Sequence, residues 1–325
     1  MKRQVFVRYG VLFPIVALVL CIHTFIGAAK ADTFGSGTNS FEIEFVKIGD
    51  AGNPADMTGQ PRPAGAVPYE YRIGKYEISE QMIDKANTLG VLAITKDTRG
   101  PDKPATSVSW FEAARFVNWL NTSTGHTPAY KFVHAVTRPP SLQFELWEPG
   151  DFGYDPDNLF RNRFARYFLP SVDEWYKAAY YDPVTGSYFD YPTGSNFLPT
   201  PVAGGTTPGT VVAMQGIPAG PADIMLAGGL SAFGTMAQGG NVEEWEESEL
   251  DLTNDNPFAL RGSRGGGWDA SPSSLSAINR GAWAPTNVTI GTGFRVARVI
   301  PEPSTLLLLM FAIIGFAFGV CRPVR

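Results

Sequence analysis

Three short segments rich in glycine and tryptophan, all toward the end of the chain, constrain the fold most strongly. They are Gly239–Trp245 (GGNVEEW), Arg264–Trp268 (RGGGW) and Gly293–Arg295 (GFR). Glycine pairs permit tight backbone turns, and the apolar residues follow neither the helical period nor the alternation of a strand. We therefore expect several irregular loops that are held together by buried aromatic rings and buried polar contacts.

Three segments further upstream belong to the same pattern. They are Tyr76–Ser79 (YEIS), Val108–Ala114 (VSWFEAA) and Leu169–Trp175 (LPSVDEW). In this order, the six segments resemble the formylglycine-generating enzyme domain, also called the sulfatase-modifying factor domain. The resemblance covers about Phe41 to Arg298, and we place the domain at residues 41–299. It implies an α+β, loop-rich fold, related to the C-type lectin fold, with few short helices and strands.

Local patterns within this domain predict where helices begin. In a capping box, a serine and a glutamate three residues later each bond the other's backbone N–H at the start of a helix. Two pairs have this spacing: Ser109 with Glu112, and Ser171 with Glu174. A further helix is expected from Ser79 to Gly90. Alternating residues predict strands at Phe41–Val46 and Tyr69–Ile73. One further strand is expected at Val211–Met214, and a hairpin is expected within Tyr130–Arg163.

Composition supports one large globular domain and limits its partners. The 325 residues are 44% hydrophobic and include 35 glycines and 26 prolines, which favours a loop-rich globule over a helical bundle. The first 31 residues contain four basic residues and no acid, so their removal takes the net charge from -5 to -9. Phosphate binding needs a basic surface, so this charge argues against a nucleic-acid partner.

The N-terminus has the three parts of a secretory signal peptide, at residues 1–31. A basic start precedes the apolar run from Val11 to Ile26, and Ala29–Lys30–Ala31 is a small-x-small cleavage site. The mature chain is then expected to begin at Asp32, with a flexible segment at residues 32–40. The alternative is an uncleaved membrane anchor.

The C-terminus, residues 300–325, has a second targeting pattern. Pro301–Glu302–Pro303 precedes an apolar run from Leu306 to Val320 and a basic end. A run of this length with a basic end can enter a bilayer as a transmembrane segment. The order resembles the PEP-CTERM sorting signal of Gram-negative bacteria. This implies processing by an exosortase, followed by release or attachment at the cell surface, often beside exopolysaccharide. An ordinary C-terminal anchor is the alternative, and both readings place the domain outside the cytoplasm.

Cysteine usage decides which family chemistry the chain can perform. Its two cysteines, Cys21 and Cys321, lie in the predicted signal peptide and the predicted tail. The domain between them therefore has no disulfide, thiol nucleophile or thiolate metal site. Formylglycine-generating enzymes oxidise a substrate cysteine with a pair of cysteines and copper, shortly after the RGGxW segment. Residues 269–280 contain no cysteine here, so we expect neither that activity nor copper.

Histidine chemistry is equally sparse. Outside the signal peptide only His126 and His134 occur, without an acidic partner at ligand spacing. A histidine metal site or a catalytic triad needs more than these two residues. A loop with Asp151, Asp155 and Asp157 could offer oxygen ligands, although its spacing matches no calcium-binding motif and a solvated loop is favoured.

The resemblance implies one metal site that does not need cysteine. In the family, the GNxxEW segment wraps a structural calcium ion. The corresponding ligands here are the carbonyls of Gly240 and Val242 and the carboxylate of Glu244, with Ala237 where the family has an asparagine ligand. Hard oxygen ligands suit calcium. The alternative is a metal-free turn held by Asn241.

Two functional classes remain open. The first is a secreted, non-catalytic module that binds a glycan or a surface protein. The second is an enzyme with a rebuilt, cysteine-free site, for which the loose candidates are Asp269, Asn279, Arg280 and Glu243. Three arginines are expected near the family's cleft, where they either pair with Glu243 or Asp269 or bind an anionic ligand: Arg264, Arg280 and Arg295.

Overall fold

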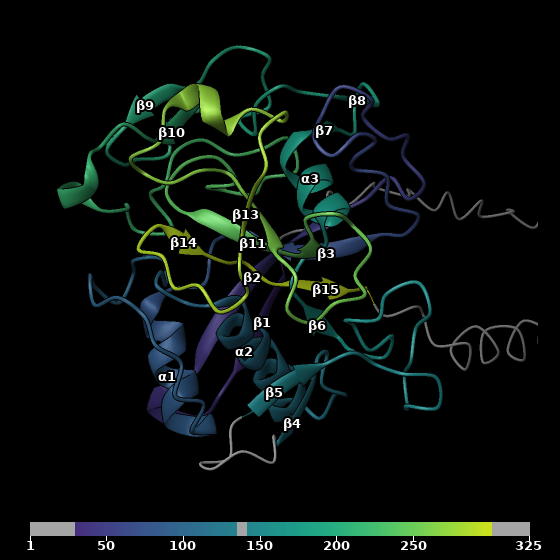
Figure 1. Cartoon of the computed structure of the whole chain (residues 1–325). Coiled ribbons are helices and arrows are strands. Elements are labelled where there is room, and N and C mark those ends of the chain that lie inside the picture. Colours follow the sequence, from purple (N-terminus) through teal and green to yellow (C-terminus); the bar gives the residue numbers. More distant parts are fainter. Residues whose placement is uncertain (1–29, 135–141, 301–325) are drawn as a thin grey trace, which may run out of the picture.

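The computed structural model describes residues 30–134 and 142–300 of the chain, and its largest sheet has five strands (Figure 1). The strand order is β1–β2–β3–β15–β6, and every neighbouring pair is antiparallel. The last strand of the domain therefore lies between β3 and β6. The bounds are β1 Lys30–Phe34, β2 Phe41–Ile48, β3 Tyr71–Gly74, β6 Tyr167–Phe168 and β15 Ala297–Val299.

A second sheet brings the three glycine-rich segments together. Its order is β13–β12–β11–β14, with β11 at Glu243–Glu249, β12 at Arg261–Arg264, β13 at Gly281–Trp283 and β14 at Thr292–Gly293. Strand β11 pairs antiparallel with β12 and parallel with β14. The remaining strands form two-stranded sheets: β4 Lys131–His134 with β5 Leu142–Glu145, β7 Tyr181–Asp182 with β8 Ser187–Tyr188, and β9 Thr200–Val202 with β10 Thr210–Val212.

The predicted helix starts are confirmed. The helices are α1 Glu80–Gly90, α2 Trp110–Ser123 and α3 Val172–Tyr180. Both expected capping boxes are present, and the Ser79 side chain accepts from the backbone of Met82 at the start of α1. Helix α1 ends at Gly90, and the residue that caps it, Val91, has a left-handed backbone. A Cβ on Gly90 would lie 2.5 Å from the Trp119 ring, so the glycine allows α1 to approach α2.

The main hydrophobic core lies between the five-stranded sheet and helices α1 and α2 (Figure 1). Trp245 and Phe294, from two of the glycine-rich segments, are fully buried in it. Phe294 packs edge-on against Phe116 of α2, with ring centroids 5.6 Å apart. The predicted burial of aromatic rings is therefore confirmed, although Trp245 lies in strand β11 and not in an irregular loop, and the α+β, loop-rich fold class holds.

The start of the domain differs from the expectation of a flexible segment at residues 32–40. All five residues of β1 pair with β2, and a 3-10 turn follows at Gly37–Asn39. Phe34 enters the core, and the Asp32 carboxylate accepts from the Tyr167 hydroxyl at 2.9 Å. The Tyr167 partner of Asp32 lies far along the chain, so this contact could not be predicted from the glycine-rich local sequence. Cleavage after Ala31 would remove two residues of this strand.

The targeting segments cannot be compared with the structure in the same way. The predicted signal peptide, sorting signal and transmembrane run fall almost entirely on residues 1–29 and 301–325, outside the described ranges. Between residues 30 and 134 and between 142 and 300, no helix combines the length and the apolarity needed to cross a bilayer.

The capping boxes lead to a first testable prediction. Replacing Ser171 by alanine should lower the free energy of unfolding by about 1 kcal/mol, because the N–H of Glu174 loses its acceptor. Urea denaturation of the two proteins measures the difference. Ser171→Thr keeps the hydroxyl and should lose less. Equal midpoints for Ser171→Ala and the unaltered protein would contradict the prediction.

Candidate functional site

Strand β11 carries four almost fully buried glutamates, each paired with an arginine from elsewhere in the chain. Uncompensated buried charges are costly, so these pairs fix the positions of the loops that supply the arginines. Short contacts run from Arg295 Nε to Glu244 Oε2 and from Arg161 Nη2 to Glu247 Oε2, both 2.6 Å, and from Arg264 Nε to Glu246 Oε1 at 2.7 Å. The full set is Glu244 with Arg295, Glu246 with Arg264 and Arg280, Glu247 with Arg161, and Glu249 with Arg261.

Arg264, Arg280 and Arg295 are thus paired with carboxylates, although not with the expected ones. Glu243 instead accepts from the Ser263 hydroxyl at 2.6 Å and from the indole N–H of Trp283 at 3.0 Å. Asp269 is exposed at the surface. Side chains alternate between the two faces of β11, and the pairing of β11 with β12 shifts register between Trp245 and Glu249. Glu244 and Glu246 therefore reach the arginines, whereas proximity in the sequence had suggested Glu243.

The four residues considered for a rebuilt enzyme site are not assembled into one. Arg280 donates to Glu246 at 2.9 Å, and the Asn279 amide donates to the Ser273 carbonyl at 3.1 Å. Among the described residues, no hydrogen bond or ion pair joins any two of Glu243, Asp269, Asn279 and Arg280. A nucleophile and a base at hydrogen-bonding distance, which acid–base catalysis requires, are not formed by this set.

The predicted calcium ligand Glu244 has other partners. Its carboxylate oxygens accept from Arg295 and from the indole N–H of Trp175, at 2.7 Å for the latter. A guanidinium therefore lies where a cation bound to this carboxylate would have to lie, and the donor set does not fit calcium while the pair is intact. Within the described ranges, no group of three or more His, Cys, Asp or Glu side chains is placed to hold a metal ion, and this includes the Asp151 loop.

The turn that holds the carbonyls of Gly240 and Val242 is instead organised by Asn241. Asn241 has a left-handed backbone, with φ of 61°, and its amide donates to Glu77 Oε2 at 2.8 Å and accepts from the N–H of Ala222 at 2.8 Å. These contacts match the metal-free alternative. Calcium binding at Gly240, Val242 and Glu244 is what the family resemblance predicts, and a melting experiment with and without calcium tests it.

Glu77 is a buried group for which sequence reasoning assigned no role. Burial raises its pKa well above the ordinary value, and the negative charge of Glu244 acts in the same direction. Its hydrogen bond to Asn241 joins the YEIS segment to the GGNVEEW segment. Glu77 is also one of the residues that line a hollow of about 330 Å³, together with Glu42 and Met82. Burial of this kind depends on tertiary packing, which no short sequence pattern reveals.

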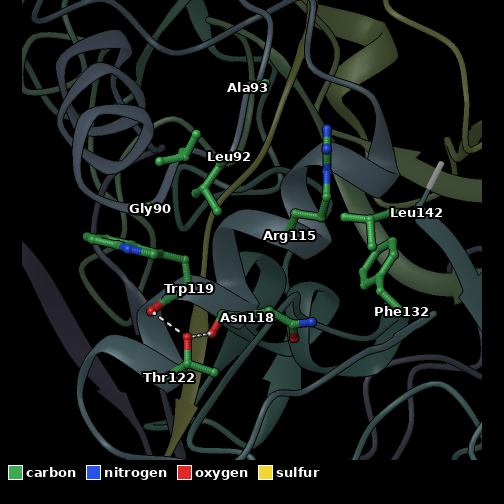
Figure 2. Close-up of a pocket in the computed structure, with 10 residues that line it drawn as sticks. Gly90, Leu92, Ala93, Arg115, Asn118, Trp119, Thr122, Phe132 and Leu142 are labelled. Carbon is green, nitrogen blue, oxygen red and sulfur yellow. Dashed lines mark hydrogen bonds between the residues drawn. The ribbon is translucent and has the colours of Figure 1, made fainter. Parts of the chain in front are cut away.

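A larger hollow lies along helix α2, and Figure 2 shows it. It has a volume of about 480 Å³ and adjoins a second hollow of about 370 Å³, with which it shares Arg115, Phe132 and Leu142. We call the two together the α2 groove. Its lining comes from the end of α1 and the loop after it (90–93), from α2 (Ser109, Phe111, Glu112, Arg115, Asn118, Trp119, Thr122), from the β4–β5 hairpin (Phe132, Leu142) and from Thr286.

Most polar groups in the α2 groove are already bonded. The Asn118 amide bonds both backbone groups of Tyr130, at 2.7 and 2.9 Å, and the Thr122 hydroxyl donates to the Asn118 carbonyl (Figure 2). Arg115 differs from these groups. Its ion pair among the described residues is with Glu112, and the distance from Arg115 Nη2 to Glu112 Oε1 is long, at 3.8 Å. Thr95 and Ser109 already donate to both oxygens of that carboxylate.

The loop at one wall of the groove has an unusual backbone. Val91 and Ala93 both have left-handed conformations, with φ of 51° and 53°. This conformation is unfavourable for residues with a Cβ, and most of all for a β-branched valine. Val91 is also 86% exposed, so burial of its side chain does not offset the strain. Strained backbone of this kind is concentrated at functional sites.

Comparison with known proteins gives two family matches. Residues 67–300 match the family described as sulfatase-modifying factor enzyme 1-like domain, and residues 299–322 match the PEP-CTERM protein-sorting motif. No curated protein matches the chain. The first match covers most of the described residues and contains all six segments of the sequence pattern.

Solved structures with the same fold include three that are aligned over nearly their whole length. Variable protein 1 of Treponema denticola superposes with a TM-score of 0.57 and 18% identity, covering 83% of this chain and 99% of its own. CarF superposes with a TM-score of 0.55 and 16% identity, covering 80% of this chain and 99% of its own. PvdO from Pseudomonas aeruginosa superposes with a TM-score of 0.51 and 17% identity, covering 84% of this chain and 100% of its own. At these identities the likeness establishes the fold alone.

Proposed function

The chain belongs to the family of sulfatase-modifying factor enzyme 1-like domains, and we propose that it is an exported member of this family that acts as a non-catalytic binding module. Its sorting motif implies processing by an exosortase and an extracellular or cell-surface location in bacteria. We further propose that the processed protein acts at the outer surface of a Gram-negative cell or in its exopolysaccharide matrix, where it binds a glycan or a surface protein.

One observation carries the non-catalytic role: the domain contains no thiol. Cys21 and Cys321 are the only cysteines in the sequence, and both lie outside residues 67–300. The family's oxidation of a substrate cysteine requires two thiolates that bind copper, and a serine hydroxyl has too high a pKa and too hard an oxygen to replace them. After Trp268, where the family places its cysteines, this chain has a 3-10 turn at Pro272–Leu275.

The alternative is an enzyme of the same family with a rebuilt active site. It is the weaker proposal, because Glu243 and Arg280 bond to structural partners and Asp269 lies apart at the surface. A catalytic group needs a free position within hydrogen-bonding distance of the reacting atoms.

The non-catalytic role predicts the outcome of an oxidase assay. The processed protein, purified from the medium, should consume no oxygen above background with a cysteine-containing sulfatase peptide, with or without added copper. A cysteine-containing member of the family serves as the positive control. Turnover of the peptide by the purified protein, with formation of formylglycine detected by mass spectrometry, would contradict the proposal.

A further inference from the structure

We propose that the α2 groove binds an extended peptide segment of a partner protein that presents a bulky apolar side chain next to a carboxylate. The apolar side chain occupies the hollow between α2 and the β4–β5 hairpin, and the carboxylate binds Arg115. This inference rests on the proposed binding role and names the chemistry of the ligand.

The size and walls of the groove suit an apolar side chain with flanking peptide. The larger hollow alone, about 480 Å³, is within the range of specific ligand sites. Leu92, Trp119, Phe132 and Leu142 supply apolar surface, and Leu142 is 47% exposed. Covering these side chains would remove apolar surface from water, which favours association.

Arg115 supplies the charge that selects the ligand. The residue lies where the two hollows meet, and Figure 2 shows its side chain beside Phe132 and Leu142. Its neighbour Glu112 accepts two hydrogen bonds at each carboxylate oxygen from Thr95 and Ser109. The planar guanidinium can therefore form a bidentate pair with a carboxylate of the ligand.

The groove favours a peptide over a glycan. Sugar rings carry several hydroxyl groups, and each one that is buried without a partner weakens binding. Asn118 and Thr122, which could serve such hydroxyls, are bonded to the protein's own backbone. By contrast, the backbone N–H groups of Leu92 and Ala93 donate no hydrogen bond within the described part of the chain. An extended peptide can accept from such exposed groups along the loop.

A selection from a displayed library of random peptides tests this inference on the full processed protein. Peptides enriched on the unaltered protein should share a bulky apolar residue next to Asp, Glu or the chain terminus. Arg115→Gln should weaken the best peptide about tenfold or more, since a charge-assisted pair is lost. Leu142→Ser should weaken it as well, and Arg115→Lys should lose less than Arg115→Gln.

Matched variants distinguish the groove from the rest of the surface. Arg163→Gln removes an exposed arginine and Val184→Ser an apolar residue that is 89% exposed, both away from the groove lining, and neither should change peptide affinity. Melting curves check that each variant is folded.

Three outcomes would overturn the inference: no enriched peptide, enrichment without a carboxylate, or an affinity that Arg115→Gln leaves unchanged. Binding of an acidic or neutral glycan on an array, lost in Arg115→Gln and Leu142→Ser, would also overturn it in favour of a carbohydrate ligand. Oxidase turnover would refute the non-catalytic role while leaving the peptide result intact, so the two failures are distinguishable.

Discussion

Replacing Arg295 by methionine is expected to lower the free energy of unfolding by about 3–5 kcal/mol, the largest effect of any single substitution considered for this protein. The change leaves the Glu244 carboxylate buried without its counter-charge, close to the second buried carboxyl group, Glu77. It also removes donors from the carbonyls of Gly74 and Met236, each 2.9 Å away. For a domain of this size the melting temperature should fall by roughly 10 °C.

Urea and thermal denaturation measure this effect, and Arg163→Met is the matched control. Arg163 is exposed, so its loss should change the free energy of unfolding by less than about 0.5 kcal/mol. A loss below about 1 kcal/mol in Arg295→Met would show that the pair contributes little.

The same melting experiment tests calcium binding. Because Arg295 and Trp175 occupy the Glu244 carboxylate, we expect equal melting temperatures in millimolar calcium and in a chelator. A calcium-dependent rise that disappears in Glu244→Gln would establish the site that the family resemblance implies. A rise that persists in Glu244→Gln would place a calcium site elsewhere in the chain.

The helix starts could be predicted because their determinants are local. Ser109 with Glu112, and Ser171 with Glu174, bond backbone groups within three residues, so the spacing alone specifies the contact. The order of the six segments likewise predicted the fold class. A cap depends only on chain neighbours, which a single sequence displays directly, whereas the fold class was inferred through the resemblance of the six segments to a known family.

The charge pairs of β11 could not be predicted, because their partners are remote in sequence. Glu247 bonds Arg161, which lies 86 positions away, and Glu244 bonds Arg295, which lies 51 positions away. The sequence presents these acids in a run that is typical of a solvated surface. Their burial follows from the position of β11 between β12 and β14 and against helix α3. The α2 groove could not be predicted either, since its walls come from separate helices, a hairpin and a loop that are distant from one another in the sequence.

Above pH 10 the protein should lose stability steeply, because its structure buries tyrosines as neutral hydroxyls. Burial raises the pKa of Tyr180 to about 12, and it also raises the pKa of Tyr71 and Tyr130 well above its ordinary value. In the unfolded chain these groups ionise near pH 10. The unfolded state then holds fewer protons than the folded state, so the stability that is fully present below pH 10 is lost as the pH rises toward the folded pKa.

The size of this loss follows from the number of buried hydroxyls. Each contributes up to about 1.4 kcal/mol per pH unit once the unfolded form is ionised, so three together remove about 3 kcal/mol between pH 10 and 11. Lys177 acts in the opposite direction, because burial lowers its pKa to about 8 and its folded form loses the proton first. Stability should therefore rise slightly from pH 8 to 10 and then fall.

Unfolding midpoints in urea from pH 8 to 11, with tyrosinate absorbance recorded in parallel, test the alkaline loss. Tyr180 donates to the Leu275 carbonyl at 3.1 Å, so Tyr180→Phe is less stable at neutral pH but has one titrating group fewer. Its stability should decline less steeply above pH 10, by about 1.4 kcal/mol per pH unit. Tyr154→Phe changes a partly exposed loop tyrosine and should leave the decline unaltered. An unfolding midpoint that stayed constant between pH 10 and 11 would show that these three hydroxyls ionise as readily in the folded protein as in the unfolded chain, and burial would not control their titration.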